Sequence, residues 1–520
     1  MANSNNKHPG VYFTTNQRVR RIAVEEDKNA TVLFVPILSK KGPTDVLVRC
    51  NSVSEFITTF GSSEDIVCLG HEYLNIMNWL TNGGAVSVVR IYAQEEGAAN
   101  VYATLTNKDA TTNGDSIKAK YPGNYYNNLK VTMTKVTADS FDMNAYIDNV
   151  LVESMYRINI NDYNSRFQTS NYLGKAVLTE FVKLARGESV EFTVSGSNKV
   201  DEKYSVCAIS SSGSLKDYIL GDSFIPKFKK SITAVLSDKL GVKVDIVMDA
   251  GYPYSIKKAL VDLFASSDEK VRVRDDVLLY LSTYEYSYLL DFNDKSGVDI
   301  SEKPIVSESL ESNLADADGF SICLYDQYMS IEDIYTERAG STVFVTATYF
   351  LSELIPVNDT INHVGYAIMG RNRATLSKVK SLNKNPTSSE KDDLITRGIN
   401  YVEKDTRGMC FATQFTYDLN AATNTHAKKN INNVRVINKL IKELEDIGRN
   451  YLGEMADATT IINMQQAMNN KLLSWVQGRV LDNTSAVEVY ADEYDNTVIH
   501  VVLDLKFVGI VERIYIVLNV

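Results

Sequence analysis

The sequence predicts a mixed α/β and α+β protein that is built from several domains. Its 520 residues exceed the size at which a single hydrophobic core stops growing. Two stretches, 23–95 and 232–282, alternate apolar strand-like runs with helical periodicity, which is the order of a parallel sheet covered by helices. Between them, residues 98–200 change to alternating strands, and both ends of the chain carry further strand-like segments.

The N-terminal residues 1–22 are expected to form an extended arm. Residues 1–7 are polar, and His8-Pro9-Gly10 then predicts a turn. A short strand follows this turn, beginning with Val11, Tyr12 and Phe13.

Residues 23–97 are predicted to begin an α/β domain. A strand is expected at 31–35, and Ser52 with Glu55 forms a capping-box pattern for a short helix that stops at Gly61. A longer helix with apolar residues at helical spacing follows between 66 and 80 and ends at Gly83-Gly84, and 86–91 forms the next strand.

Residues 98–204 are interpreted as a β-rich domain that is inserted into the α/β domain and faces outward. Strands are expected at 117–121, 129–136, 141–147, 151–160 and 190–194, with one helix near 172–185. The α/β domain resumes at 205 and extends to 385, so it is discontinuous. The polar segment 375–393, which spans the boundary to the next domain, is typical of a linker.

Residues 386–508 are predicted to form a C-terminal domain with one long helix from about Asn432 to Leu452. One face of this helix is an apolar stripe, and the opposite face is basic, with Arg435, Lys439, Lys442 and Arg449 against a single Asp446. In a chain of net charge −11, this face favours an electrostatic contact with an acidic partner. The alternative is a solvated surface with one Lys442–Asp446 pair, worth a few tenths of a kcal/mol.

The last residues, 509–520, are predicted to form a C-terminal strand arm. Its alternate positions are apolar on both faces, so the strand must be buried on both sides. It is either an edge strand of the chain's own sheet or a strand that is donated to another copy by β-augmentation. The residues expected to form it are Ile514, Tyr515, Ile516, Val517 and Leu518.

Composition and motifs argue against several classes of function. The acidic net charge argues against a nucleic-acid-binding surface, and we expect no signal peptide and no membrane insertion because no apolar run is long enough. The five scattered cysteines are typical of reduced core thiols. His71 and Glu72 begin like a zinc-protease helix, but Asn75 replaces the second histidine, and no phosphate-binding loop occurs. We therefore expect no enzyme activity, no metal and no cofactor.

Six segments in order along the chain resemble contractile phage tail sheath proteins. They are Pro9-Gly10-Val11-Tyr12, Gly42-Pro43 with the helix that ends at Phe60-Gly61, Asn82-Gly83-Gly84 with the strand that ends at Arg90, Tyr121-Pro122-Gly123 with Asn128-Leu129, Gly398-Ile399-Asn400, and Ile431 to Arg435. Residues 339–359 depart from the family's central segment.

This resemblance implies a mixed α/β sheath core with an outer β-rich domain and two terminal arms. It implies a structural subunit that forms homo-hexameric rings, stacked helically around a tail tube, and that contracts to drive the tube through the host envelope. The expected partners are further copies, the tube protein, which the basic helix face would contact, and baseplate and tail terminator proteins. The protein would belong to the virion tail and be assembled in the host cytoplasm. A sheath of a headless phage-derived particle is an alternative within this class, and a hydrolase is an alternative from another class, which would need a clustered nucleophile and base.

Overall fold

Eight strands form a central sheet in which the parallel order expected from the sequence is confirmed. The computed structural model describes residues 13–15, 18–20, 31–94, 101–107, 114–208, 215–221, 223–238, 241–286, 301, 303–307, 310–417, 427–495 and 497–510. The strand order is β22-β18-β15-β14-β3-β6-β4, with β5 paired to β3, and only β4 and β5 run antiparallel to their neighbours. The strands are β3 (Val32–Ser39), β4 (Leu47–Cys50), β5 (Ile66–Val67), β6 (Ala85–Arg90), β14 (Ile246–Met248), β15 (Leu278–Ser282), β18 (Ile322–Tyr325) and β22 (Ile399–Asn400).

Helices cover this sheet, and every residue of β3, β6 and β15 is buried, as expected for strands covered on both faces. Helix α2 packs against α8, and α5 packs against α6. The helices of this part of the molecule are α1 (Val53–Phe60), α2 (Glu72–Thr81), α4 (Leu215–Leu220), α5 (Phe224–Leu236), α6 (Tyr254–Ala265), α7 (Leu310–Asn313) and α8 (Thr348–Ile361).

The short helix α1 begins and ends where the sequence predicts. The hydroxyl of Ser52 accepts a hydrogen bond from the backbone N–H of Glu55 at 3.2 Å. The Glu55 carboxylate accepts the N–H of Asn51 at 2.8 Å, so the return bond reaches one residue before the N-cap. Gly61 ends the helix with a φ of +95°, which glycine adopts without steric cost.

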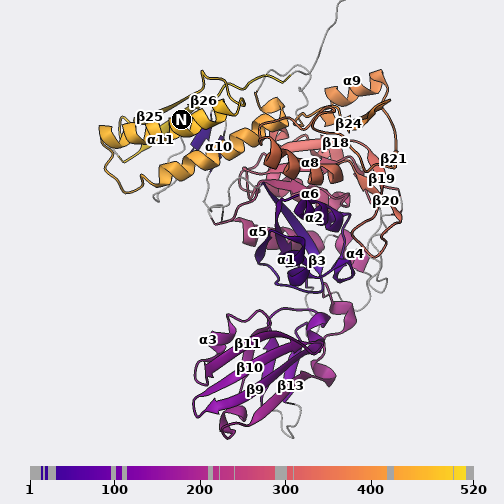
Figure 1. Cartoon of the computed structure of the whole chain (residues 1–520), viewed down its shortest axis with the longest axis vertical. Helices are drawn as coiled ribbons and strands as arrows, with labels where there is room; N and C mark the ends of the chain where they lie inside the picture. Colours follow the sequence, from indigo (N-terminus) through magenta and orange to yellow (C-terminus); the bar gives the residue numbers. More distant parts are fainter. Residues whose placement is uncertain are drawn as a thin grey trace, which may run out of the picture.

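A second, seven-stranded antiparallel sheet lies apart from the central sheet, at the lower end of the molecule in Figure 1. Buried and partly exposed residues alternate along β9 and β10, so one face of the sheet forms its own core. The expected strands are present, while the place of this sheet as an outer inserted domain stays a prediction. Its strands are β7 (Thr104–Asn107), β8 (Ser116–Ala119), β9 (Leu129–Thr137), β10 (Ser140–Ile147), β11 (Val150–Asn159), β12 (Leu173–Val177) and β13 (Ser189–Val194), with helix α3 (Tyr163–Phe167) after β11.

The helix expected near 172–185 is wrong. Residues Leu173–Val177 form β12, which pairs with β8, and only a single 3-10 turn follows at Phe181–Lys183. The apolar side chains of this segment meet a neighbouring strand, and such tertiary pairing overrides local periodicity.

Arg90, the last residue of β6, joins the two sheets. Its buried guanidinium donates hydrogen bonds to the backbone carbonyls of Ser39 at 2.6 Å, Gly42 at 2.7 Å and Pro122 at 2.9 Å. Ser39 and Gly42 belong to the central sheet region, whereas Pro122 lies between β8 and β9. The charge is therefore held by carbonyl dipoles that come from both parts of the molecule.

Smaller elements surround the far end of the central sheet. The region 375–393, expected as a linker, contains β21 and the start of α9, and α9 begins with a capping box between Thr387 and Glu390. These elements are β16 (Tyr284–Glu285), β17 (Ile305–Val306), β19 (Tyr328–Glu332), β20 (Thr342–Thr346), β21 (Ser381–Leu382), α9 (Ser388–Thr396), β23 (Val402–Asp405) and β24 (Gly408–Phe411).

The C-terminal part projects from the body as two long helices and a hairpin, at the upper left of Figure 1. They are α10 (Ile431–Arg449), α11 (Ala458–Gln477), β25 (Ala486–Ala491) and β26 (Ile499–Asp504). At the other end of the sequence, β1 (Phe13–Thr15) and β2 (Arg18–Arg20) form an antiparallel hairpin. Across the part of the chain described, no helix combines the length and apolar character that crossing a membrane requires.

Candidate assembly surface

The projecting C-terminal part has its own hydrophobic core. Helices α10 and α11 pack together, and β25 packs on α11. Leu440 and Leu444 of α10 meet Met468, Leu472 and Trp475 of α11 in one cluster. These α11 residues recur at spacings of three and four, which is the signature of an amphipathic helix, and the cluster extends to the inward side of the hairpin.

The sequence prediction of a single long helix missed α11. The signals were present, because Asp457 precedes the apolar stripe and its carboxylate accepts the N–H of Thr460 at 2.8 Å as the N-cap. Trp475 then fixes the partner helix, since its indole N–H donates to the Glu443 carboxylate of α10 at 2.8 Å.

The basic face predicted for α10 is not a solvated surface, and Arg435 shows this first. Arg435 is 6% exposed and pairs with the Asp359 carboxylate at 2.5 Å. The hydroxyl of Thr31 also donates to this carboxylate. Burial would lower the pKa of the Arg435 guanidinium, but Asp359 and other nearby groups raise it, so the side chain is a buried cation.

Lys442 is also engaged inside the chain. Its ammonium lies 2.7 Å from the Asp245 carboxylate and 3.2 Å from that of Asp276, and no bond to Asp446 replaces them among the described contacts. Asp276 also accepts two hydrogen bonds from Arg274, at 2.8 and 2.7 Å. Burial raises the pKa of Asp245, but Lys442, Lys243 and the Val32 N–H outweigh burial and lower it to about 2.

The remaining two basic residues differ from these. Lys439 of α10 is half-buried, and burial lowers its pKa. Arg449 lies half-buried in the last turn of α10, where a cation is favourable for the helix dipole. The solvated basic face is thus wrong for Arg435 and Lys442, because their acidic partners come from distant strands and helices. The contact of α10 with a tube stays a prediction.

The hairpin of β25 and β26 is a sheet of two strands with one face on α11 and the other on solvent. Val487 and Val489 pair with Leu503 and Val501 on the inward face. Glu488 pairs with Val502 on the outward face, where Val502 is 45% exposed. Two strands alone are marginally stable in water, and further strands are the usual completion of such a sheet.

The N-terminal hairpin approaches this C-terminal hairpin. Strand β1 lies against β26, and in Figure 1 the short indigo strand is drawn beside the yellow elements. Of the predicted arm residues, Phe13 is the first residue of β1. Val11 and Tyr12, and the strand residues Ile514, Tyr515, Ile516, Val517 and Leu518, lie outside the described residues.

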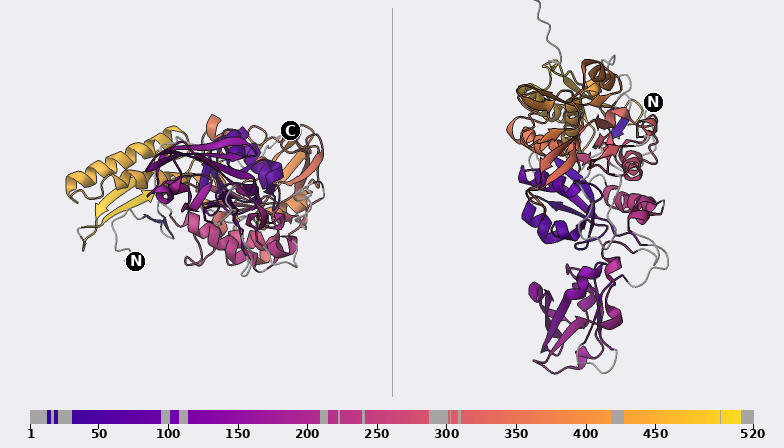
Figure 2. Two further views of the ribbon diagram at one scale, coloured as in Figure 1. Left: turned by 90° about the horizontal axis from the view of Figure 1, so that it is seen from below. Right: turned by 90° about the vertical axis from the view of Figure 1, so that its right-hand side faces the viewer.

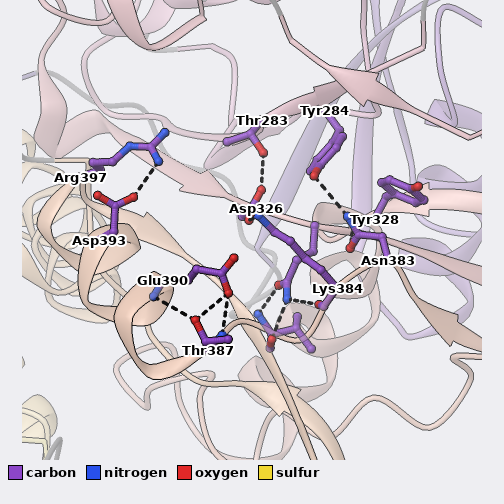
Figure 3. A network of polar contacts seen from close by, with 12 residues as sticks. Thr283, Tyr284, Asp326, Tyr328, Asn383, Lys384, Thr387, Glu390, Asp393 and Arg397 are labelled. Carbon is purple, nitrogen blue, oxygen red and sulfur yellow. Dashed lines mark hydrogen bonds and ion pairs between the residues drawn. The ribbon is translucent and has the colours of Figure 1, made fainter.

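The carboxyl ends of the parallel strands, where open α/β sheets bind ligands, are occupied by the chain's own polar groups. Thr283, after β15, donates to the Asp326 carboxylate after β18 at 2.8 Å, and Lys384 lies 2.9 Å from the same carboxylate (Figure 3). Asn383 donates to the Tyr284 hydroxyl at 3.2 Å, and its own carbonyl accepts the Tyr328 N–H at 3.2 Å. This edge is therefore closed by the segment that carries β21.

A second buried group of polar residues lies after β14. The ammonium of Lys257 is 2.5 Å from the Asp249 carboxylate, and both side chains are fully buried. His71 hydrogen-bonds Asn75 at 2.9 Å and Thr346 at 2.8 Å through its two ring nitrogens, and burial lowers its pKa to about 3. Asn75, which interrupts the zinc-protease pattern, is thus the partner that orients a neutral histidine. In the described ranges, no three His, Cys, Asp or Glu side chains are grouped so as to hold a metal.

Comparison with known proteins identifies the fold. No family model matches the sequence, and no curated protein matches it. The sheath tail protein Lin1278 from Listeria innocua is similar with a TM-score of 0.56, at 12% identity, over 94% of this chain and 94% of that protein. A sheath tail protein from Desulfitobacterium hafniense has a TM-score of 0.46 at 11% identity over 96% and 100% of the two chains. The contracted helical sheath of the anti-feeding prophage has a TM-score of 0.49 at 12% identity over 99% of each. The likeness to Lin1278 shows that the chain has the fold of a sheath tail protein over nearly its whole length. This confirms the mixed α/β multidomain fold that the sequence resemblance implies, whereas the outer inserted domain and the terminal arms stay predictions.

Proposed function

We propose that the chain is the structural subunit of a contractile tail sheath. In this function, homo-hexameric rings of the subunit stack helically around a tail tube, and contraction drives the tube through the host envelope. The observation that carries the proposal is the sheath-tail fold, shared with Lin1278 over 94% of both chains. The six ordered sequence segments that resemble sheath proteins support the same function independently.

The C-terminal hairpin is the proposed joint between copies. Strands β25 and β26 form a sheet with a solvent-facing side, and the chain has strand-prone residues at both ends to complete it. Added strands contribute main-chain hydrogen bonds at about 1 kcal/mol each, together with buried apolar side chains. Contacts of this kind between different surfaces of identical subunits generate open helical assemblies.

Contraction in this proposal needs only two packings of rigid subunits. If the contracted packing buries about 200 Å² more apolar surface per subunit, it releases roughly 5 kcal/mol per subunit at ~25 cal/mol/Å². The extended state is then held by assembly kinetics, and the terminal strands keep the subunits linked during the change. The proposed partners are further copies, a tube protein, a baseplate and a tail terminator, within a virion tail assembled in the host cytoplasm.

A sheath of a headless phage-derived particle is the second candidate, and the fold supports both equally. A hydrolase is the candidate from another class. The occupied carboxyl edge of the parallel sheet argues against it, because the usual place of a substrate is occupied by Asp326, Lys384 and Asn383.

Electron microscopy of the purified protein tests the proposal. We expect long hollow tubes with six-fold symmetry in cross-section. The matched control is the chain without residues 513–520, which we expect to remain as single subunits. Single subunits of the intact chain under all salt and pH conditions would refute the sheath function.

A further inference from the structure

The strand β26 has a neighbour within its own chain. Along the described residues β26 forms a ladder with β25 alone, and β1 of the N-terminal hairpin lies against it. The left-hand view of Figure 2 shows the yellow hairpin of β25 and β26 from a second direction, beside the long C-terminal helices. The first and last strands that the structure describes therefore meet in a single subunit.

The charges of the two hairpins are complementary. The N-terminal hairpin, residues 13–20, contains Arg18 and Arg20 and no acidic residue, and Glu25, Glu26 and Asp27 follow it in the connection to the body. Residues 486–506 contain one basic residue, Lys506, and five acidic residues, which are Glu488, Asp492, Glu493, Asp495 and Asp504. Glu488, Glu493, Asp495 and Asp504 are exposed, so they attract a basic strand that approaches from solvent. The C-terminal residues 511–520 contain one acidic and one basic residue, and charge does not favour them at this surface.

The N-terminal hairpin is joined to the body by a connection that is short in sequence. Thr31, where the described body begins, is fixed because its hydroxyl donates to the Asp359 carboxylate beside Arg435 of α10. From Arg20 to Thr31 the chain advances eleven residues, at most about 38 Å when extended. A tether of this length holds the N-terminal hairpin at a millimolar effective concentration near its own β26.

We propose that the free subunit covers its own strand-docking surface at β26 with its own N-terminal hairpin, and that polymerisation exchanges this hairpin for that of another copy. The proposal rests on the proposed sheath function for its second half. Exchange of an identical element between copies costs little, because the interactions that a hairpin gives up in its own subunit form again on the neighbouring one. The self-covered state shields β26 from other chains before assembly begins.

Hydrogen exchange of the unpolymerised full chain tests the first half. The Thr14→Pro variant removes a donor from β1 and restricts its backbone, so we expect at least tenfold faster exchange of the β26 amides, with β14 unchanged. Asn5→Pro, which lies before β1, is the matched control and leaves β26 unchanged. Equal exchange of β26 in Thr14→Pro and the unmodified chain overturns the proposal.

Two further experiments test whether β26 is covered by its own chain and whether charge contributes to this contact. Protection of β26 by its own chain is independent of protein concentration, so protection that disappears on dilution would overturn the proposal in favour of a second copy. Raising the salt concentration weakens protection in the unmodified chain, and replacing Arg18, Arg20 and Arg21 by Gln removes this salt dependence. Salt-independent protection in the unmodified chain would contradict the role of charge.

Electron microscopy of tube formation, measured separately from hydrogen exchange of β26, distinguishes this proposal from the proposed sheath function. Tubes in the electron microscope together with β26 exchange that Thr14→Pro does not change would refute self-covering and leave the sheath function standing. Protected β26 in a chain that never forms tubes would refute the sheath function and leave self-covering standing.

Discussion

Lys442 is the residue at which sequence reasoning and structure differ most. Its neighbours along α10 indicate a solvated cation, because residues four positions apart lie on one helix face. Its actual partners, Asp245 and Asp276, precede it by 197 and 166 positions, and no local pattern indicates them. Arg435 and Asp359 are likewise an ion pair between residues far apart in the sequence, at a separation of 76 positions. Buried charge pairs depend on the assembled fold, so they are the part of the site that periodicity cannot predict.

Replacing Lys442 by Met should destabilise the protein by about 1–3 kcal/mol, because the partly buried Asp245 loses its nearest cation while Asp276 keeps Arg274. Lys183→Met is the control, since Lys183 and Glu180 are both more than half exposed and such pairs contribute about 0–1 kcal/mol. Urea denaturation monitored by tryptophan fluorescence and circular dichroism measures both. Equal urea midpoints for the two variants would mean that Lys442 contributes no more to stability than an exposed ion pair does.

The ion pair of Lys442 with Asp245 predicts that the protein loses stability at acidic pH. The folded pKa of Asp245, about 2, lies below its ordinary value of 3.8, so its contribution is complete above pH 4 and is lost as the pH falls from about 4 to 2. Lys442→Met removes the main cation that lowers this pKa. Thermal melting between pH 2 and 5 should therefore show a shallower acid limb in the variant, and parallel limbs would contradict the assignment.

Gly123 is expected to tolerate no side chain. Its φ is +116°, and a Cβ there would lie 2.8 Å from the Ser205 carbonyl oxygen and 3.1 Å from the Arg90 guanidinium. Gly187, with a φ of +87° and open space around it, is the matched control. Gly187→Ala should cost about 1–2 kcal/mol from backbone strain alone. Gly123→Ala should cost about 1–3 kcal/mol more because the added atom overlaps its neighbours, which differential scanning calorimetry can measure.

At the scale of elements, the sequence predicts those helix and strand boundaries that depend on residues within a single turn. The cap at Ser52 and the glycine stop at Gly61 place α1 correctly, since both act within a single turn. The segment 173–177 has a helical pattern but forms a strand that pairs with β8. The local pattern does not predict this strand, because its partner lies more than fifty residues earlier in the chain. The same dependence on distant partners explains why a polar segment gives no sequence signal for β21.

The C-terminal strand is the element on which polymerisation should depend. Deleting Arg513 to Val520 is expected to abolish polymerisation and to leave a soluble, cooperatively melting subunit, because the strand serves a neighbouring copy. A Pro in place of Ile516 should act similarly, since it removes a ladder donor and fixes φ. Size-exclusion chromatography beside calorimetry measures both properties. An insoluble truncated chain, or one that melts far lower, would mean that the strand belongs to its own subunit's core.

At the scale of the whole molecule, the proposed sheath function requires only a change of packing between subunits. We therefore expect purified particles to contract unchanged in the presence of a chelator and in the absence of ATP. Electron microscopy after a contraction trigger, with and without EDTA, measures the contracted fraction. Particles that stall in EDTA and recover with added magnesium would contradict a purely mechanical subunit.

The points where the two terminal segments leave the body lie close together in the fold. Thr31 is bonded to Asp359 at the end of α8, and Val508 donates its N–H to the Val480 carbonyl at 3.1 Å. Gly365, six residues after Asp359, packs directly on the Val480 side chain. A pull on one terminus thus passes to the other through a few residues beside α10. In the proposed sheath, tension between neighbouring subunits would therefore pass beside α10 and bypass the seven-stranded sheet.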